Sequence, residues 1–239
     1  MDMHCKLSGK PLTEVINLGD LYVSNFCKTI DENAPRAPLR IGIGEESGLL
    51  QLMDPVERPP LYQQYWYRSG TNATMTRQLN DVVTAFREWV RLKHGDVTLD
   101  IGCNDGTLMG LLPKNLELFR IGIDPAENLA ELARKNCEAH STGFFSKDRF
   151  MELSGGRKAR VITSIAMFYG VEDPASFVRD ISECLADDGV WVLQLSYTPL
   201  MIKQIAFDNI CHEHIQYYTL LSLKYLLEQF EFDILDVEF

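Results

Sequence analysis

The sequence lacks the features by which several common classes of protein are recognised. No apolar run approaches the roughly 20 residues that span a bilayer, and the first ten residues, MDMHCKLSGK, contain no apolar signal core. Basic residues are scarce, since 23 Lys and Arg stand against 34 Asp and Glu and the formal net charge is −11. A basic face for nucleic-acid phosphates is not expected. The sequence therefore predicts a cytoplasmic protein that binds neither membranes nor nucleic acids.

Paired cysteines are missing as well. No C-x-x-C pair occurs among the six cysteines, which are scattered along the chain: Cys5, Cys27, Cys103, Cys137, Cys184 and Cys211. Because there is no secretory signal, free thiols are expected rather than disulfides. The composition is otherwise ordinary for a globular protein, with 46% hydrophobic and 24% charged residues.

The chain divides into three parts by composition and pattern. Residues 1–60 are rich in Gly and Pro, and their short apolar runs EVINL, PLRIGI and GLLQL predict two or three strands in a small β-rich module that ends at ERPP. Residues 61–94 form a linking segment and a helix, because apolar residues recur at helical spacing from Met75 to Leu92. Residues 95–239 form the main domain.

Strands and helices alternate in this main domain. The apolar runs predict strands over 97–103, 119–124, 160–168, 190–196 and 231–239, and the periodicity predicts helices over 107–115, 125–136, 173–189 and 219–230. Gly189 is expected to close the third of these helices. Such alternation predicts an α/β fold with a mainly parallel sheet and helices on both faces.

One turn in this domain has the composition of a ligand-binding loop. Asp100-Ile101-Gly102-Cys103-Asn104-Asp105-Gly106-Thr107 follows a strand and opens a helix, and Gly102 and Gly106 allow the backbone to approach a ligand closely. The next strand ends at Asp124-Pro125, 24 residues after Asp100. An acid there can accept both hydroxyls of a ribose, which predicts a nucleoside site at the carboxyl ends of the strands. The alternative is a plain strand-to-helix turn.

The charge of the loop selects among nucleosides. Dinucleotide-binding loops place a pyrophosphate at the helix N-terminus, and Asp105 would repel it. The same acid suits a cationic sulfonium. S-adenosylmethionine is therefore the expected cofactor, in preference to NAD.

These residues resemble the class I S-adenosylmethionine-dependent methyltransferases, which have a Rossmann-like fold. The segments YWYRSGTNATM, AMFYGVEDPASFV and FDNICHEHIQYYTLLSL narrow the resemblance to the sugar C-methyltransferases, which methylate C3 of nucleotide-linked 4-keto-deoxysugars. The resemblance extends over nearly the whole chain. It implies a sugar or sugar-nucleotide substrate, in surface-polysaccharide or natural-product biosynthesis.

The resemblance also implies roles for individual residues. Ser164, Ile165 and Ala166 match positions beside the methionine moiety, and Tyr67 and Ser69 match a segment that closes over the cofactor. The implied cofactor-binding set is Tyr67, Ser69, Asp100, Gly102, Asn104, Asp105, Gly106, Thr107, Asp124, Pro125, Ser164, Ile165 and Ala166. Glu213 and His214 match the acidic and basic pair beside the sugar.

That pair fits the chemistry of carbon methylation. The reaction removes a proton next to a ketone, for which a histidine is a suitable base and an adjacent carboxylate can orient it. His212 belongs to the same candidate catalytic group; a polar turn or a metal site is the alternative for the HEH segment. Two histidines are few for zinc, which usually has three or four protein ligands, so no metal is expected. Tyr217 and Tyr218 could line the substrate pocket or pack in the core.

The sequence departs from the family in three ways. The family's two C-x-x-C zinc pairs correspond here to Cys5, Ser8, Gly44 and Ser47, so no zinc is expected in the module, and Cys27 is not expected to replace a ligand. A catalytic histidine and tyrosine of some members correspond to Gly170 and Cys211, for which the neighbouring Tyr169 could substitute.

The third departure is the missing second α/β domain, which suggests either a fragment or a minimal member. The lone strand expected at 231–239 would leave an unpaired sheet edge, from which a homodimer is possible. The alternatives to a sugar C-methyltransferase are O- or N-methylation of a sugar, a small-molecule O- or N-methyltransferase outside sugar metabolism, a non-catalytic cofactor-binding scaffold, and an NAD-dependent oxidoreductase, which the acidic loop disfavours.

Overall fold

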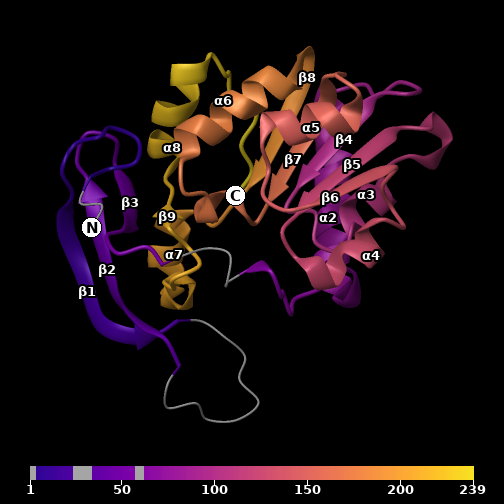
Figure 1. The fold of residues 1–239 in the computed structure, drawn as a ribbon. Helices are drawn as coiled ribbons and strands as arrows, with labels where there is room; N and C mark the ends of the chain where they lie inside the picture. The colour runs from indigo at the N-terminus through magenta and orange to yellow at the C-terminus, as the bar shows by residue number, and fades with distance from the viewer. Residues whose placement is uncertain (1–3, 24–33, 57–61) are drawn as a thin grey trace. The chain divides into compact units, whose positions relative to one another are not determined.

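The computed structural model describes residues 4–23, 34–56 and 62–239. Contacts within the chain divide it into two compact units (Figure 1). The first, here called the α/β unit, comprises residues 62–167 and 179–194. The second, the antiparallel unit, comprises residues 1–61, 168–178 and 195–239, so it combines segments from both ends of the sequence.

A five-stranded parallel sheet forms the centre of the α/β unit. Its order is β6-β5-β4-β7-β8, made of β4 (Val97–Ile101), β5 (Phe119–Asp124), β6 (Ala139–Thr142), β7 (Ala159–Ile165) and β8 (Leu185–Gln194). The first strand in sequence, β4, lies in the middle and is buried along its whole length. The chain proceeds outward from β4 on one side and then on the other, so a topological switch point lies between β4 and β7. The predicted Rossmann-like fold is confirmed.

The helices of this unit are α2 (Ala73–Trp89), α3 (Thr107–Leu111), α4 (Ala130–Ala133) and α5 (Lys147–Ser154), with short 3-10 turns at Ser69–Thr71, Lys114–Leu116 and Glu127–Leu129. Helix α6 (Pro174–Cys184) leads into β8. The side chain of Asn72 caps α2, accepting hydrogen bonds from the backbone N–H groups of Thr74 and Met75. No helix in the described residues has the length and apolarity that a membrane span requires.

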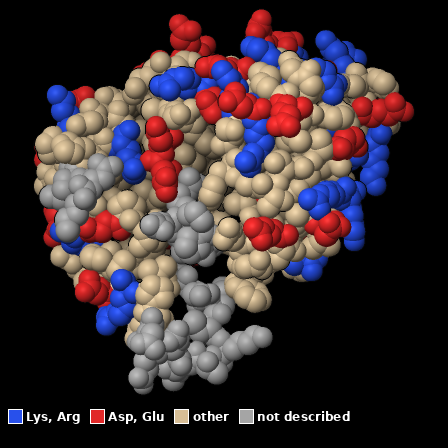
Figure 2. Space-filling model, viewed as in Figure 1, with Lys and Arg blue, Asp and Glu red and all other residues tan. Residues whose placement is uncertain are grey.

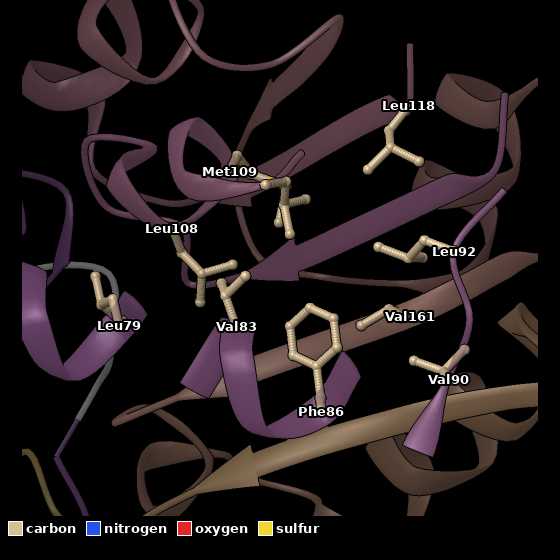
Figure 3. Packing of buried hydrophobic residues seen from close by; sticks show 10 residues of the cluster. Leu79, Val83, Phe86, Val90, Leu92, Leu108, Met109, Leu118 and Val161 are labelled. Atoms are coloured by element: carbon tan, nitrogen blue, oxygen red, sulfur yellow. The ribbon is translucent and has the colours of Figure 1, made fainter. Parts of the chain in front are cut away.

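The main core packs α2 and α3 against the sheet (Figure 3). Phe86 of α2 is 3% exposed and lies beside Val83 of the same helix, Leu108 of α3 and Val161 of β7. These residues come from the helical spacing predicted for Met75–Leu92 and from the apolar runs predicted as strands. Their burial fixes the position of β4 and α3, and thereby of the loop that joins them.

An antiparallel sheet forms the second unit. Its order is β1-β2-β3-β9, made of β1 (Thr13–Tyr22), β2 (Arg36–Gly44), β3 (Leu49–Leu52) and the two-residue strand β9 (Gln216–Tyr217). Leu50 pairs with Tyr217 and Gln51 with Gln216, across more than 160 positions of sequence. The unit also contains α7 (Thr198–Gln204), α8 (Leu220–Leu227), and 3-10 turns at Phe168–Gly170, Phe207–Asn209 and Glu228–Phe230.

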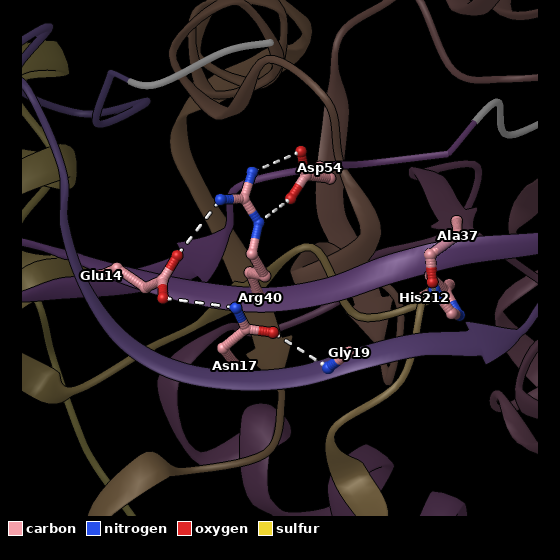
Figure 4. A network of polar contacts seen from close by, with 7 residues as sticks. All are labelled: Glu14, Asn17, Gly19, Ala37, Arg40, Asp54 and His212. Atoms are coloured by element: carbon pink, nitrogen blue, oxygen red, sulfur yellow. Dashed lines mark hydrogen bonds and ion pairs between the residues drawn. The ribbon is translucent and has the colours of Figure 1, made fainter.

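Polar contacts reinforce this sheet (Figure 4). The Arg40 guanidinium binds both carboxylate oxygens of Asp54, at 2.7 and 2.8 Å, and also reaches Glu14 at 3.2 Å. Such bidentate pairing of a guanidinium with a carboxylate is geometrically specific. It joins β1, β2 and the segment after β3.

Two predicted elements are wrong. The helix expected over 173–189 ends at Cys184, and Gly189 lies within β8 rather than at a helix end. Asp187, Asp188 and Gly189 are poor helix formers, and a Cβ on Gly189 would lie 3.0 Å from the Ala159 carbonyl oxygen, a position that admits only glycine without a shift.

The strand expected over 231–239 is not formed either, since residues 232–239 carry no regular structure. Its alternating apolar residues have no neighbouring strand to pair with, and Leu235 and Phe239 are 54% and 75% exposed. In the described residues, β8 rather than a strand over 231–239 therefore forms that edge of the parallel sheet. Cys27 and the ERPP turn lie outside the described residues.

Candidate functional site

The glycine-containing loop has the backbone conformation that its sequence predicts. Gly102 and Gly106 have φ angles of 74° and 76°, in the left-handed region that favours glycine. A Cβ on Gly106 would lie 3.0 Å from the backbone of Ala133, so α3 and α4 approach each other closely there. The loop stands at the carboxyl end of β4, beside the switch point of the sheet.

Asp124 connects this loop to the next strand. It is 7% exposed at the end of β5, where Oδ2 accepts a hydrogen bond from the Asn104 N–H at 2.8 Å and Oδ1 accepts one from the Ala126 N–H at 2.7 Å. Burial raises the pKa of its carboxyl, while these two backbone bonds lower it. A carboxylate has about four lone-pair positions, so acceptor capacity remains for a ligand. Pro125 lies between Asp124 and Ala126 in the sequence.

A second carboxyl group lies below the loop. Asp100 of β4 is 3% exposed, and Oδ1 accepts a hydrogen bond from the Thr163 hydroxyl of β7 at 2.6 Å. Burial raises the pKa of Asp100 to about 7, the Thr163 bond lowers it, and the charge of Asp124 raises it. A carboxyl with this pKa is only partly ionised near pH 7, and its burial keeps it beneath the loop rather than at its surface. A cation bound above would favour ionisation of both acids.

Two loop side chains hold the segment Tyr67–Gly70. The Asn104 side chain accepts from the Ser69 N–H and donates to the Tyr67 carbonyl, both at 3.0 Å. Asp105 Oδ2 accepts from the Gly70 N–H at 2.9 Å, and Oδ1 binds the N–H and hydroxyl of Thr107. The predicted closing segment is thus fastened to the loop by the side chains of Asn104 and Asp105.

The attachment of residues 67–70 to the glycine-containing loop should depend on the side chain of Asp105. We expect Asp105→Ala to accelerate hydrogen exchange of the amides of residues 67–70 by about fivefold, because a lost hydrogen bond contributes about 1 kcal/mol. The matched control is Asp81→Asn, on the exposed face of α2. If exchange in 67–70 does not change, Asp105 does not hold this segment.

The predicted residues at the end of β7 bind residues of the neighbouring strand β8. The Ser164 hydroxyl accepts a hydrogen bond from the Trp191 indole at 3.1 Å, and Ile165 is half-buried. Ala166 has a φ of 52°, and its N–H donates to the Gln194 carbonyl at 2.9 Å. This left-handed turn ends the strand.

His214 lies in the antiparallel unit, half-buried beside Tyr169. Its Nδ1 lies 2.8 Å from the Asn209 carbonyl oxygen, and the rings of His214 and Tyr169 have centroids 4.1 Å apart. Burial lowers the pKa of His214, and the Asn209 hydrogen bond raises it in part. Burial also raises the pKa of the adjacent Glu213. The structure thus brings Tyr169 against His214, which Glu213 precedes in the sequence.

His212 occupies a different environment. It is 3% exposed, and its Nε2 lies 3.2 Å from the Ala37 carbonyl oxygen of β2 (Figure 4). The two histidines of the HEH segment therefore bind different backbone carbonyls. In residues 4–23, 34–56 and 62–239, no group of three or more His, Cys, Asp and Glu side chains is arranged to hold a metal ion.

Tyr217 and Tyr218 pack in the core. Tyr217 is 4% exposed among Leu39, Ile41 and Leu52, and Tyr218 is 1% exposed and stacks on Phe168 at 5.3 Å. Burial raises the pKa of both hydroxyls. The core-packing alternative therefore describes these two tyrosines.

The positions that match the family's zinc ligands lie together. The Cys5 thiol is 3.1 Å from the Ser47 hydroxyl, and a Cβ on Gly44 would lie 2.5 Å from that sulfur. Burial raises the Cys5 pKa, but hydrogen bonds from Ser47, Ser8 and the backbone outweigh it and leave the pKa lowered. The thiol of Cys5 is thus held by hydrogen bonds within this cluster.

Two contributions were not foreseen from the sequence. One is the Asn209 carbonyl beside His214, which no side-chain pattern reveals because it is a backbone group. The other is Asn128, whose side chain binds both the N–H and the carbonyl of Tyr65, at 3.0 and 2.9 Å.

Acidic and basic side chains alternate over the α/β unit in Figure 2, and several of them pair, such as Arg120 with Glu138.

Comparison with known proteins adds to this geometry. Residues 71–237 match the family described as Methyltransferase domain. The chain is similar to the C-methyltransferase NovU of Streptomyces niveus, with 28% identity over 207 residues that cover 84% of this chain and 48% of that protein. The chain thus spans about half the length of this relative.

Solved structures share the fold at low identity. The plantazolicin methyltransferase BpumL, in complex with SAH, has a TM-score of 0.53 and 18% identity, covering 68% of this chain and 66% of its own. The cyclopropane synthase MmaA2 from Mycobacterium tuberculosis has a TM-score of 0.51 and 16% identity, covering 74% and 71%.

Proposed function

The chain belongs to the Methyltransferase domain family, whose methyl donor is S-adenosylmethionine, and we propose that its acceptor is a carbon atom next to the ketone of a nucleotide-linked sugar. The relative NovU is named a C-methyltransferase, which supports carbon as the acceptor. The sugar rests on the resemblance of the FDNICHEHIQYYTLLSL segment to sugar C-methyltransferases.

The residues of the α/β unit fit the cofactor. Asp124 has acceptor capacity for the ribose hydroxyls, and Gly102 and Gly106 bring the loop backbone close. A sulfonium bound above Asp100 and Asp124 would favour the ionised forms of both acids, whose pKa values burial raises. When bound, S-adenosylmethionine supplies an electrophilic methyl group. The cofactor site is then closed and supported, through the contacts described above, by five further residues: Tyr67, Ser69, Asn104, Asp105 and Thr107.

The observation that carries the proposal is a half-buried histidine, His214, whose Nδ1 lies 2.8 Å from the Asn209 carbonyl oxygen. Because burial lowers the pKa of His214, its imidazole is neutral near pH 7 and can take a proton. We propose that His214 removes the proton next to the ketone, and that the electron pair of the C–H bond moves toward the ketone oxygen to form an enolate. The enolate carbon would then accept the methyl group that bound S-adenosylmethionine would supply, with the electron pair of the broken bond left on sulfur.

Glu213 and Tyr169 have supporting roles in this proposal. Glu213 adjoins the base, and its raised pKa allows it to share a proton with a sugar hydroxyl. Tyr169 lies against the imidazole ring. His212 holds the segment to β2 through Ala37 and has no part in the proton transfer.

Isotope retention tests the proposal. The full chain is incubated with methyl-labelled S-adenosylmethionine and a nucleotide-linked 4-keto-deoxysugar that carries deuterium at C3. We expect the label to appear in the sugar and the C3 deuterium to be lost, because carbon methylation breaks that bond.

The same experiment separates the alternatives. Transfer of label with full retention of deuterium would indicate O-methylation and overturn the carbon assignment. Labelling of a hydroxylated or aminated small molecule, with no sugar labelled across a panel, would overturn the sugar assignment.

A further inference from the structure

His214 has two ring nitrogens, and one of them has a fixed partner. Nδ1 lies 2.8 Å from the carbonyl oxygen of Asn209. A carbonyl oxygen only accepts hydrogen bonds, so the neutral imidazole makes this contact with a proton on Nδ1. Nε2 then carries the lone pair. The partner on one side of the ring thus determines which atom is the base.

The Asn209 carbonyl is itself held in place by a side chain. Asn209 ends the 3-10 turn Phe207–Asn209. Its Oδ1 accepts a hydrogen bond from the Ser196 hydroxyl at 3.2 Å, and its Nδ2 donates to the Ala206 carbonyl at 3.3 Å. The Asn209 N–H also donates to Ala206 at 3.3 Å. The turn is therefore fastened to the segment that follows β8.

The neighbouring backbone limits the movement of the imidazole. The His214 N–H donates to the Cys211 carbonyl at 3.2 Å, and the Ile215 N–H donates to the Tyr169 carbonyl at 2.9 Å. With the Tyr169 ring 4.1 Å from the imidazole, measured between centroids, the ring is bounded on a second side. The direction of Nδ1 then depends on where the Asn209 carbonyl lies.

We infer that Ser196 and Asn209 are positioning residues, which hold His214 in its Nδ1-protonated form and so make Nε2 the atom that receives the substrate proton. The inference deepens the proposed function and rests on it for the role of Nε2. The tautomer itself is a property of the chain alone. In this inference Ser196 and the Asn209 side chain act through His214.

Nitrogen NMR tests the inference without any substrate. In the full chain labelled with ¹⁵N, two-bond ¹H–¹⁵N spectra distinguish an imidazole protonated at Nδ1 from one protonated at Nε2. His214 is one of five histidines, and its signals are identified by their loss in His214→Gln. We expect the wild-type chain to show the Nδ1-protonated form near neutral pH.

Variants of Ser196 and Asn209 should change the tautomer of His214 that the NMR spectrum shows. We expect Ser196→Ala and Asn209→Ala to give a mixture of the two tautomers and to lower kcat about tenfold with KM unchanged, as loss of one hydrogen bond implies. Ser196→Thr keeps the hydroxyl and should restore both values. The matched control is Ser182→Ala, which removes a hydroxyl that donates to the Arg179 carbonyl at 2.8 Å, within α6.

The outcomes are distinguishable. An Nε2-protonated His214 in the wild-type chain, or a tautomer that does not change in either alanine variant, would overturn the inference. This reading does not depend on activity. If the tautomer behaves as expected but His214→Gln retains full turnover, the positioning stands and the proposed catalytic role of His214 fails.

Discussion

Replacing His214 with alanine should lower kcat by about 10²- to 10⁴-fold, the range over which a positioned general base contributes, while S-adenosylmethionine binding stays at the wild-type level. Binding and turnover should respond differently because the proposed cofactor contacts belong to the α/β unit, whereas His214 belongs to the antiparallel unit. Turnover is measured with labelled cofactor, and binding by calorimetry.

Two further variants separate chemistry from packing. His214 is half-buried, so alanine leaves a cavity, and His214→Gln provides a replacement of similar size. The matched control is His94→Gln, whose exposed side chain pairs with Glu117. Equal losses of turnover and cofactor binding in both His214 variants would mean that the residue is structural.

The same assignment fixes the direction of the pH dependence. Burial lowers the pKa of His214 below its usual 6.5, so its neutral form persists below pH 6.5. We expect kcat/KM to rise with pH through this lowered pKa and to level off before neutral pH. The unfolded chain binds the proton more readily, so the contribution of His214 to stability is complete above pH 6.5 and is lost as the pH falls below it.

Replacing Asp124 with asparagine should weaken S-adenosylmethionine binding by about 100-fold or more, since hydrogen bonds to a charged acceptor contribute about 1.5–3 kcal/mol each. The two oxygens of Asp124 already accept the N–H groups of Asn104 and Ala126. An amide would place a donor against one of these donors, so the variant disturbs the loop as well. Calorimetry gives the affinity, and thermal unfolding reports on the fold.

A comparison of two ligands tests why Asp124 matters. S-adenosylhomocysteine has the same ribose as the cofactor but no positive charge, so it should lose affinity by the same factor if the ribose hydroxyls are the partners. A loss confined to S-adenosylmethionine would show instead that Asp124 acts through its charge alone. The matched control is Asp96→Asn, another loop carboxylate that accepts a backbone N–H, from Lys93 at 2.7 Å.

Local sequence was sufficient for the elements that build the cofactor loop. Strands β4 and β5 are short apolar runs that lie buried on the sheet, and the loop glycines have the positive φ angles that favour glycine. Strand β6 was missed because Ala139–Thr142 is short and half-buried, with one apolar residue in four. The run 231–239 misled for the opposite reason, since its alternation suits a strand but no partner strand is available.

Contacts between distant segments account for the remaining differences. No local pattern indicates that Gln216 and Tyr217 pair with β3, or that His212 binds the Ala37 carbonyl. The HEH motif placed both histidines in one candidate catalytic group, whereas their backbone partners differ. The sequence left pocket lining and core packing open for Tyr217 for the same reason, because it packs against residues from β2 and β3 that lie far away in the sequence.

The pairing of β3 with β9 has a consequence for how the domain is delimited. A shortened chain that begins at residue 71, where the family match starts, would lack the strand beside Tyr217 and the carbonyl that holds His212. The segment carrying the proposed base would then lose its lateral support, even though the parallel sheet stays complete. Strands β2 and β3 are thus structural partners of the HEH segment.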